Sequence, residues 1–341
     1  MTAALPNPLL GWRLRLEDLH FIGTNLQRPE CILAERDGTL WSADARGGVM
    51  KIAPDGRQTL ITQSIDSHFD LEGDVKASLL TGTLPNGLAF AANGDVLISN
   101  FGTDRLEVMT RSGETRILYD SIEGLPIGKV NFVLRDSKNR IWLTVSTMVN
   151  PWSNAITPAI RDGYIALADH RGIRVIADGF QFTNEIRFDA AEEWLYVAET
   201  TGKHITRLRI GEDCKVLARE IYGPENLGDG LVDGIAFDAY GNLWTTMIFA
   251  DRLIAITPTG DVEELAVFGN PEATAAFERA FAGDGPVPFA VLNACGGSIA
   301  PWLASITFSG SDLRTVCLGS LRGTTLPFFR SPVAGLPMIH W

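Results

Sequence analysis

Six strand-like segments of the chain open at the same register position, and five of the residues there carry a side-chain oxygen. Five of the six segments have a polar first residue, and in each an alternating apolar run and a polar turn follow. The opening residues are Glu30, Asn86, Asn131, Asn184, Asp233 and Ala304. Converging carboxylate and amide oxygens are what a hard divalent cation such as calcium requires. The pattern therefore predicts a metal site, provided that the fold brings these positions together.

A plainer interpretation is that Asn or Asp opens a strand because its side chain caps the preceding turn. Capping explains a single position well, but it does not favour Glu30. An anion buried near a channel also needs a compensating partner. For the set as a whole we therefore favour a metal site over turn capping.

The elements that must position these residues form a repeat. Two clear copies read "ECILAERDGTLWSAD" from Glu30 and "DGIAFDAYGNLWTTM" from Asp233, and each is followed by two more strand-like segments. Four short antiparallel strands, repeated six times with little helical periodicity, predict an all-β fold, a six-bladed β-propeller with four-stranded antiparallel blades. We expect a single domain over 1–341, with blades starting near 30, 86, 131, 184, 233 and 304.

Ring closure and loop lengths follow from this topology. The last blade lacks a clear fourth strand, and we expect the segment 11–21 to supply it. The face where first strands start, here called the near face, should carry the longer connections, which we expect at 62–85, 147–162, 222–232 and 269–297. Long loops gathered at one end of a rigid scaffold commonly carry function. Connections on the near face carry the aromatic and histidine residues Phe69, His68, Trp152, Phe249 and Trp302, which could form an apolar mouth.

The chain resembles the gluconolactonase, SMP-30 (regucalcin) and luciferin-regenerating-enzyme family over residues 28–335. The marks of the resemblance are the glutamate of "RPE", the asparagines of "KVNF" and "FTNEIRF", and the aspartate of "LVDGIAFD". The resemblance implies that Glu30, Asn184 and Asp233 bind one divalent metal ion. It also implies that Asn131 lies beside metal and substrate, and we count it among the ligands. Asn86 has no counterpart among the family's usual ligands.

Two departures concern the substrate. Family members commonly follow the glutamate with Gly-Pro, whereas this chain has Cys31 and Ile32. Sugar-lactone enzymes of the family place an arginine two residues before the channel asparagine, where this chain has Lys129. The sequence therefore leaves open whether the substrate is a sugar or a non-sugar lactone, and we take Asn86, Lys129 and Trp152 as candidate substrate contacts.

The leading functional hypothesis is a metal-dependent hydrolase that opens a lactone or related cyclic ester. The metal would polarise the ester carbonyl, Asp233 would act as general base, and Asn131 would position substrate or water. We expect calcium, while the same ligands accept zinc, manganese or magnesium. The chain lacks a G-x-S-x-G pattern, and its five histidines form no recognisable catalytic relay. The alternatives are a non-hydrolytic reaction in the same pocket, as in strictosidine-synthase-like propellers, and a small-molecule-binding scaffold with a structural metal.

The amino-acid composition limits the classes of binding partner that we expect. The chain has 41 acidic and 29 basic residues, a formal net charge of −12, which disfavours nucleic acid and anionic membranes as partners. Neither a signal peptide nor an apolar run of about 18 residues is present, so we expect a cytoplasmic protein. Its four cysteines show no C-x-x-C spacing, and we expect buried, reduced thiols. A small-molecule lactone or ester remains as the expected partner, bound by a monomer or small homo-oligomer.

Overall fold

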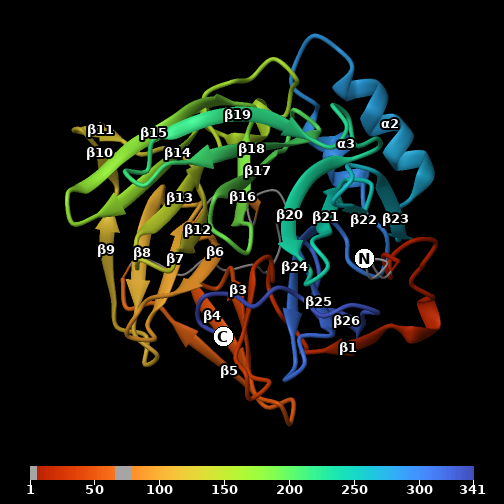
Figure 1. Cartoon of the computed structure of the whole chain (residues 1–341), viewed down its shortest axis with the longest axis horizontal. Helices are drawn as coiled ribbons and strands as arrows, with labels where there is room; N and C mark the ends of the chain where they lie inside the picture. The colour runs from red at the N-terminus through yellow and green to blue at the C-terminus, as the bar shows by residue number, and fades with distance from the viewer. Residues whose placement is uncertain (1–5, 66–78, 81) are drawn as a thin grey trace, which may run out of the picture.

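The computed structural model describes residues 6–65, 79–80 and 82–341, and in it six four-stranded antiparallel sheets surround a central channel (Figure 1). This confirms the predicted six-bladed β-propeller. Blade 1 is formed by β2 (Ile32–Ala34), β3 (Leu40–Asp44), β4 (Gly48–Ile52) and β5 (Gln58–Thr62). Blade 2 is formed by β6 (Pro85–Phe90), β7 (Val96–Asn100), β8 (Arg105–Met109) and β9 (Thr115–Tyr119). Blade 3 is formed by β12 (Val130–Arg135), β13 (Ile141–Val145), β14 (Gly163–Asp169) and β15 (Gly172–Phe180).

The second half of the ring repeats this order. Blade 4 is formed by β16 (Thr183–Phe188), β17 (Trp194–Glu199), β18 (His204–Ile210) and β19 (Val216–Tyr222). Blade 5 is formed by β20 (Leu231–Phe237), β21 (Leu243–Ile248), β22 (Arg252–Ile256) and β23 (Val262–Val267). Blade 6 is formed by β24 (Leu303–Ser309), β25 (Thr315–Ser320), β26 (Leu326–Arg330) and β1 (His20–Ile22). The first strand of each blade contacts the first strands of its two neighbours, so these six strands line the channel.

The strand that closes the ring differs from the predicted one. β1 pairs with β26 over only His20–Ile22, so the prediction of a strand over 11–21 is wrong in its bounds. The preceding residues form a short 3-10 helix, η1 (Leu16–Asp18), in which Arg15 Nε donates to Asp18 Oδ2 at 2.8 Å. Leu14 is buried, and its backbone N–H donates to Leu265 of blade 5 at 2.9 Å. Leu14 therefore packs against blade 5, and the residues before His20 do not extend the closing strand.

A glycine follows the opening polar residue in two inner strands, β6 and β20, and explains how closely these strands approach their neighbours. A Cβ atom on Gly87 would lie 2.7 Å from the Phe132 Cα atom, and one on Gly234 would lie 2.5 Å from the Ala304 carbonyl oxygen. Only glycine fits such an approach of neighbouring backbones. The pairs Asn86-Gly87 and Asp233-Gly234 thus lie within β-strands and are not hairpin turns.

A tryptophan in the second strand of three blades ties that strand to the turn before it. The indole Nε1 atoms of Trp41, Trp142 and Trp244 each donate at 2.8 Å to a turn carboxylate. These carboxylates belong to Glu35, Asp136 and Asp238. Since all three indoles are buried between blades, the bond supplies a partner for a donor that would otherwise be orphaned.

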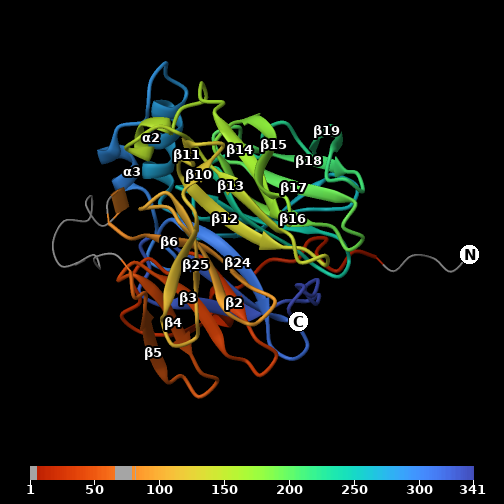
Figure 2. The ribbon, with the colours of Figure 1, turned by 90° about the vertical axis from the view of Figure 1, so that its left-hand side faces the viewer.

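The two faces of the ring differ as the loop lengths predict. The predicted near-face segment 269–297 is not irregular throughout, because it contains α2 (Pro271–Phe281) and α3 (Phe289–Ala294). Asn270 caps α2 by accepting from Glu272 N and Ala273 N. Figure 2 shows both helices on one face and the C terminus on the opposite face, here called the far face. The helices in the described part of the chain are all too short or too polar to span a lipid bilayer.

The near-face connections also include a 3-10 helix, η2 (Trp152–Ala155), and a two-stranded ribbon formed by β10 (Ser121–Ile122) and β11 (Leu125–Pro126). Of the predicted segment 62–85, residues 66–78 and 81 lie outside the described part of the chain, as do His68 and Phe69. The aromatic side chains of the other near-face loops pack into one cluster over the channel mouth. On the near face, therefore, loops and buried aromatic side chains cover the mouth of the channel.

Candidate metal centre

Four residues that the sequence predicted as metal ligands lie together at the near end of the channel. They are Glu30, Asn131, Asn184 and Asp233, here called the candidate ligands. Each comes from a different blade and lies within two residues of the first residue of its inner strand. All four are at least 94% buried, and they line one hollow with an empty volume of about 400 Å³, its open mouth included. Residues at equivalent positions of four blades thus lie close together in space.

Each candidate ligand presents one buried oxygen for which the described residues provide no hydrogen-bond partner. These atoms are Glu30 Oε2, Asn131 Oδ1, Asn184 Oδ1 and Asp233 Oδ1. Glu30 Oε2 has only an ion pair with Arg28, and the other three have no partner among the described residues. Buried polar atoms are nearly always hydrogen-bonded, so four such oxygens lining one hollow indicate a missing ligand. Two carboxylate and two amide oxygens form a donor set that suits a hard divalent cation. The residues present therefore fit the metal ion that the sequence pattern predicts.

Hydrogen bonds around the hollow orient the two amides. Asn184 Nδ2 donates to Thr200 Oγ1 at 3.0 Å, which leaves its amide oxygen without a protein partner. The backbone carbonyl of Asn131 accepts from Ser99 Oγ at 2.6 Å and from Asn86 Nδ2 at 3.0 Å. Because these bonds fix the surrounding backbone and the amide nitrogen, the free oxygens need no rearrangement to meet a cation.

The electrostatics of the hollow also favour a cation. Burial raises the pKa of Glu30 to about 7, with Arg28 opposing the shift and Glu185 adding to it. Burial, followed by the nearby charges of Glu30 and Glu185, raises the pKa of Asp233 well above its ordinary range. Two carboxylates that are this reluctant to ionise indicate a site short of positive charge. A divalent cation would supply that charge.

Arg28 is a residue of this site to which the sequence analysis gave no role. Its Nη2 atom lies 3.0 Å from Glu30 Oε2, an ion pair without hydrogen-bond alignment, and donates to Asn86 Oδ1 at 2.6 Å. Its Nη1 atom donates to the Pro85 carbonyl at 3.1 Å. The backbone of Arg28 has φ +52°, a left-handed conformation that is uncommon for a residue with a side chain. The only sequence signal was its place in "RPE", two residues before the predicted ligand.

The three predicted substrate contacts differ in their positions. Asn86 and Trp152 line the hollow, whereas Lys129 is not among its lining residues. Both ends of the Asn86 amide are engaged, one by Arg28 and the other by the Asn131 carbonyl. Lys129 is buried, and its Nζ atom forms an ion pair with Asp104 at 2.9 Å. The cation expected near the channel asparagine is therefore held outside the hollow.

The walls of the hollow are apolar. Trp152 of η2 lies at the wall, and its indole Nε1 donates to the Leu79 carbonyl at 2.8 Å. Phe249 packs edge-on against Trp302, which is itself buried behind the wall and does not line the hollow. The apolar lining residues are Phe101, Trp152, Ile156, Phe182, Ile248, Phe249 and Leu321. The polar groups of the hollow thus lie among the candidate ligands and their immediate partners.

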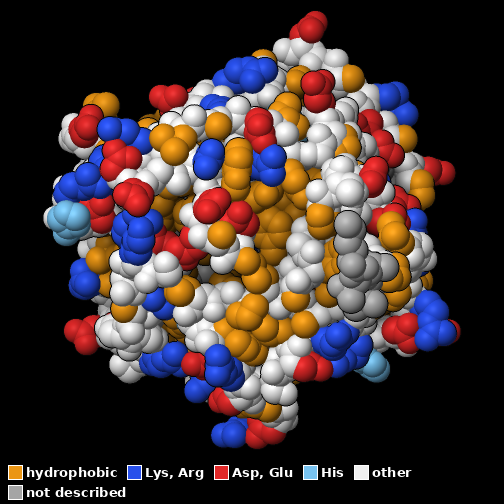
Figure 3. Space-filling view, viewed as in Figure 1, with side chains coloured by type: hydrophobic (Ala, Val, Ile, Leu, Met, Phe, Trp, Pro, Cys, Tyr) orange, Lys and Arg blue, Asp and Glu red, His pale blue; other side chains and the backbone are white. Residues whose placement is uncertain are grey.

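A buried ion pair lies further along β16. Glu185 Oε2 is 2.8 Å from Arg187 Nη2 and accepts from the Ile235 backbone N–H at 3.2 Å. The Arg187 guanidinium also lies over the Phe132 ring, 4.4 Å from its centroid. Beyond this pair, a larger cavity opens on the far face, with an empty volume of about 1370 Å³ including its mouth. Figure 3 shows hydrophobic side chains gathered around a hollow in the middle of that face.

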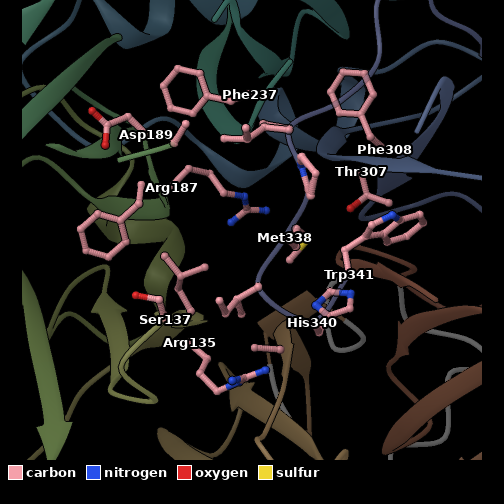
Figure 4. A pocket seen from close by; sticks show the side chains of 18 of the residues that line it. Arg135, Ser137, Arg187, Asp189, Phe237, Thr307, Phe308, Met338, His340 and Trp341 are labelled. Atoms are coloured by element: carbon pink, nitrogen blue, oxygen red, sulfur yellow. The ribbon is translucent and has the colours of Figure 1, made fainter. Parts of the chain in front are cut away.

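The polar groups of the far cavity have partners in the protein. Figure 4 shows the segment with Met338 and His340 crossing the cavity near Arg187. His340 Nε2 lies 2.9 Å from the Ala34 carbonyl oxygen, and Arg135 Nε donates to the Phe90 carbonyl at 2.7 Å. None of the orphaned buried atoms of the described residues belongs to a residue that lines this cavity. The near-face hollow, although smaller, is therefore the site with unsatisfied chemistry.

No group of three or more His, Cys, Asp or Glu side chains suited to a metal occurs in residues 6–65, 79–80 and 82–341. The candidate ligands include only two carboxylates, so the site depends on the two amides as well. It would therefore be a weakly charged oxygen site, the kind that calcium accepts with water or substrate in the remaining positions.

Comparisons with known proteins agree with the fold. A family model described as an SMP-30/gluconolactonase/LRE-like region matches residues 28–284. No curated protein sequence compared with the chain is significantly similar to it.

Three solved structures illustrate the structural likeness. A gluconolactonase from Xanthomonas campestris is 17% identical, with a TM-score of 0.65 over 92% of this chain and 89% of that one. A luciferin-regenerating enzyme is 12% identical, with a TM-score of 0.67 over 94% and 98%. A calcium-binding protein, regucalcin, from Agrobacterium tumefaciens is 13% identical, with a TM-score of 0.65 over 93% and 96%. At these identities the likeness shows a shared fold and no more.

Proposed function

From the premise that this chain belongs to the SMP-30/gluconolactonase/LRE-like family, we propose that it is a metal-dependent hydrolase that opens a lactone or related cyclic ester. The observation that carries the proposal is the set of four orphaned oxygens, one from each candidate ligand, around one near-face hollow. The match to the SMP-30/gluconolactonase/LRE-like family model supports the reaction class. Membership of an enzyme-like family suggests a small-molecule substrate.

Glu30, Asn131, Asn184 and Asp233 would hold the metal ion, which we expect to be calcium, with zinc, manganese and magnesium as alternatives. Bound there, a divalent cation would polarise the ester carbonyl and stabilise negative charge on its oxygen. The remaining chemistry belongs to the chain. Its buried floor and apolar walls exclude bulk water, which strengthens every electrostatic interaction within the hollow.

Asp233 is the residue that we propose as general base. Its carboxylate is 4% exposed and would accept a proton from the attacking water. Asn131 would orient substrate or water through its amide, a neutral group that adds no further charge to a crowded site. Asn184 is held by Thr200 and acts as a ligand only.

Hydrolysis of a panel of lactones, followed with a pH indicator, tests this proposal. Chelated protein should be inactive, and separate return of calcium, zinc, manganese or magnesium should restore turnover with at least one metal. Asp233→Asn should remain inactive with every metal. Asp213→Asn removes an exposed carboxylate far from the hollow and should behave as wild type.

Three outcomes would redirect the assignment. Turnover that survives complete chelation would remove the metal from the mechanism. Absence of turnover with every metal would favour a non-hydrolytic reaction in the same hollow, of the strictosidine-synthase-like kind. Loss of fold on chelation without hydrolysis of any ester would favour a binding scaffold with a structural metal.

A further inference from the structure

The guanidinium of Arg28 is a buried cation with an unused donor. Arg28 is 7% exposed and lines the hollow beside Glu30 and Asp233. Its two terminal nitrogens contact Glu30, Asn86 and the Pro85 carbonyl, but its Nε–H finds no hydrogen-bond acceptor among the described residues. An unpaired donor on a buried charged group is costly, because the group has lost water without gaining a partner. A ligand with a negatively charged oxygen would supply that partner.

The charges of the hollow point to the same kind of ligand. Arg28 is the only lysine or arginine among the residues that line the hollow in the described chain, and Glu30 and Asp233 are its only carboxylates. A divalent cation and one guanidinium together exceed the charge of two carboxylates by one positive charge. An anionic group on the ligand would neutralise this excess in a site with little water.

The apolar walls of the hollow restrict the chemistry of the part of the ligand that lies beyond its anionic group. Seven apolar side chains form them, and the polar lining residues besides the candidate ligands are Arg28, Asn86 and Thr200. Asn86 is engaged at both ends of its amide, and Thr200 accepts from Asn184. The apolar walls offer no hydrogen-bond partner to the hydroxyl groups of a sugar lactone, whereas an aliphatic or aromatic body would bury apolar surface against them.

We propose that the hollow binds a small carboxylate with an apolar body, with Arg28 as the ligand of the carboxylate. This inference rests on the proposed function, because such an acid is what the opening of an apolar lactone yields. In that reaction the water oxygen bonds to the carbonyl carbon and the bond from that carbon to the ring oxygen breaks. The ring oxygen takes one proton, and the new carboxylic acid releases another, leaving a hydroxycarboxylate beside Arg28. The substrate class is thus an aliphatic or aromatic lactone, not a sugar lactone.

Equilibrium binding tests the inference without any turnover. Calorimetry on the calcium-loaded wild type should detect benzoate, with gluconate and neutral benzamide each weaker by about tenfold or more. Arg28→Met should lower benzoate affinity by about tenfold or more, since it removes a charge-assisted partner. Arg322→Met is the matched control, because it removes a near-face arginine that does not line the hollow, and it should bind benzoate as wild type does.

The outcomes separate this inference from the proposed function. Equal benzoate affinity in Arg28→Met and wild type would overturn it, as would gluconate binding as tight as benzoate. Tighter calcium binding in Arg28→Met with unchanged benzoate affinity would show that Arg28 acts only on the metal, which also overturns it. If Arg28→Met does not fold, Arg28→Lys and the comparison of benzoate with benzamide on wild type replace it. Benzoate binding that depends on Arg28 would support the inference even if no lactone in the panel is hydrolysed.

Discussion

Removal of the metal should make the stability of the protein depend on pH through Glu30. In chelated protein this carboxyl is 6% exposed, and no cation is present to compensate its charge. Its pKa in the folded protein is raised to about 7 from an ordinary value of 4.5. We therefore expect chelated protein to lose stability as the pH rises from about 5 to about 8.

The sign follows from the protons bound in each state. Between the two pKa values the folded protein keeps a proton on Glu30 that the unfolded chain has already released. The free energy of unfolding therefore starts to fall as the pH rises above about 4.5, and the loss is complete above about 7. A difference of about 2.5 pKa units corresponds to about 3 kcal/mol of destabilisation. Burial raises the pKa of Asp233 and of Glu185 as well, which acts in the same direction.

Urea unfolding at about one-unit pH steps from about 5 to about 8, with and without chelator, measures this effect. Glu30→Gln is the matched variant, because it keeps the side-chain shape and removes the titrating group. His340 contributes with the opposite sign, since burial lowers its pKa and its neutral form favours the folded state as the pH rises. The difference between wild type and Glu30→Gln cancels that contribution. Saturating calcium should remove most of the wild-type slope.

Identical slopes in chelated wild type and chelated Glu30→Gln would refute this reasoning. The same holds for a wild type that becomes more stable, relative to the variant, as the pH rises. Either result would mean that Glu30 is ionised in the metal-free folded protein. The positive charge of Arg28 would then be enough to compensate the negative charge of Glu30.

Three further predictions concern the site and its support. Asp233→Asn should weaken calcium binding about tenfold or more and abolish lactone turnover, as measured by calorimetry and the pH-indicator assay; retained turnover with metal bound would remove Asp233 from the mechanism. Lys129→Met should leave kcat/KM within about twofold, because Lys129 is paired with Asp104 outside the hollow; a drop of about tenfold would give it a role in substrate binding. Trp142→Ala should lower the free energy of unfolding by about 3–5 kcal/mol, since it removes a fully buried indole bonded to Asp136; a loss below about 1 kcal/mol in urea titrations would contradict the packing described.

The parts of the fold that could be predicted are those that repeat. Apolar alternation and polar turns recur in every blade, so the inner strands begin one or two residues from their predicted starts. The same register placed Glu30, Asn131, Asn184 and Asp233 around one hollow, because six equivalent positions of a closed ring face one channel.

The parts that were missed do not repeat. Arg28 precedes its strand, and its position depends on a left-handed backbone that no periodicity reveals. The segment 11–21 alternates like a strand, but its Arg15–Asp18 contact and its packing on blade 5 are tertiary features. The helix α2 did have a local signal, because Asn270 is an N-cap and Pro271 a first-turn proline. The prediction of an irregular segment at 269–297 did not use this signal.

Because blade 6 combines strands from both ends of the sequence, it cannot form until synthesis of the chain is almost finished. Its outer strand is residues 20–22 and its other three strands are residues 303–330, so a ribosome must synthesise nearly the whole ring before β1 meets β26. Until then the emerging chain is an open arc whose end strands expose unpaired backbone N–H and C=O groups. Such edges can pair with those of another chain, and the nascent arc is the stage at which chaperones would be needed most. The ring closes only when the three residue pairs between β1 and β26 form.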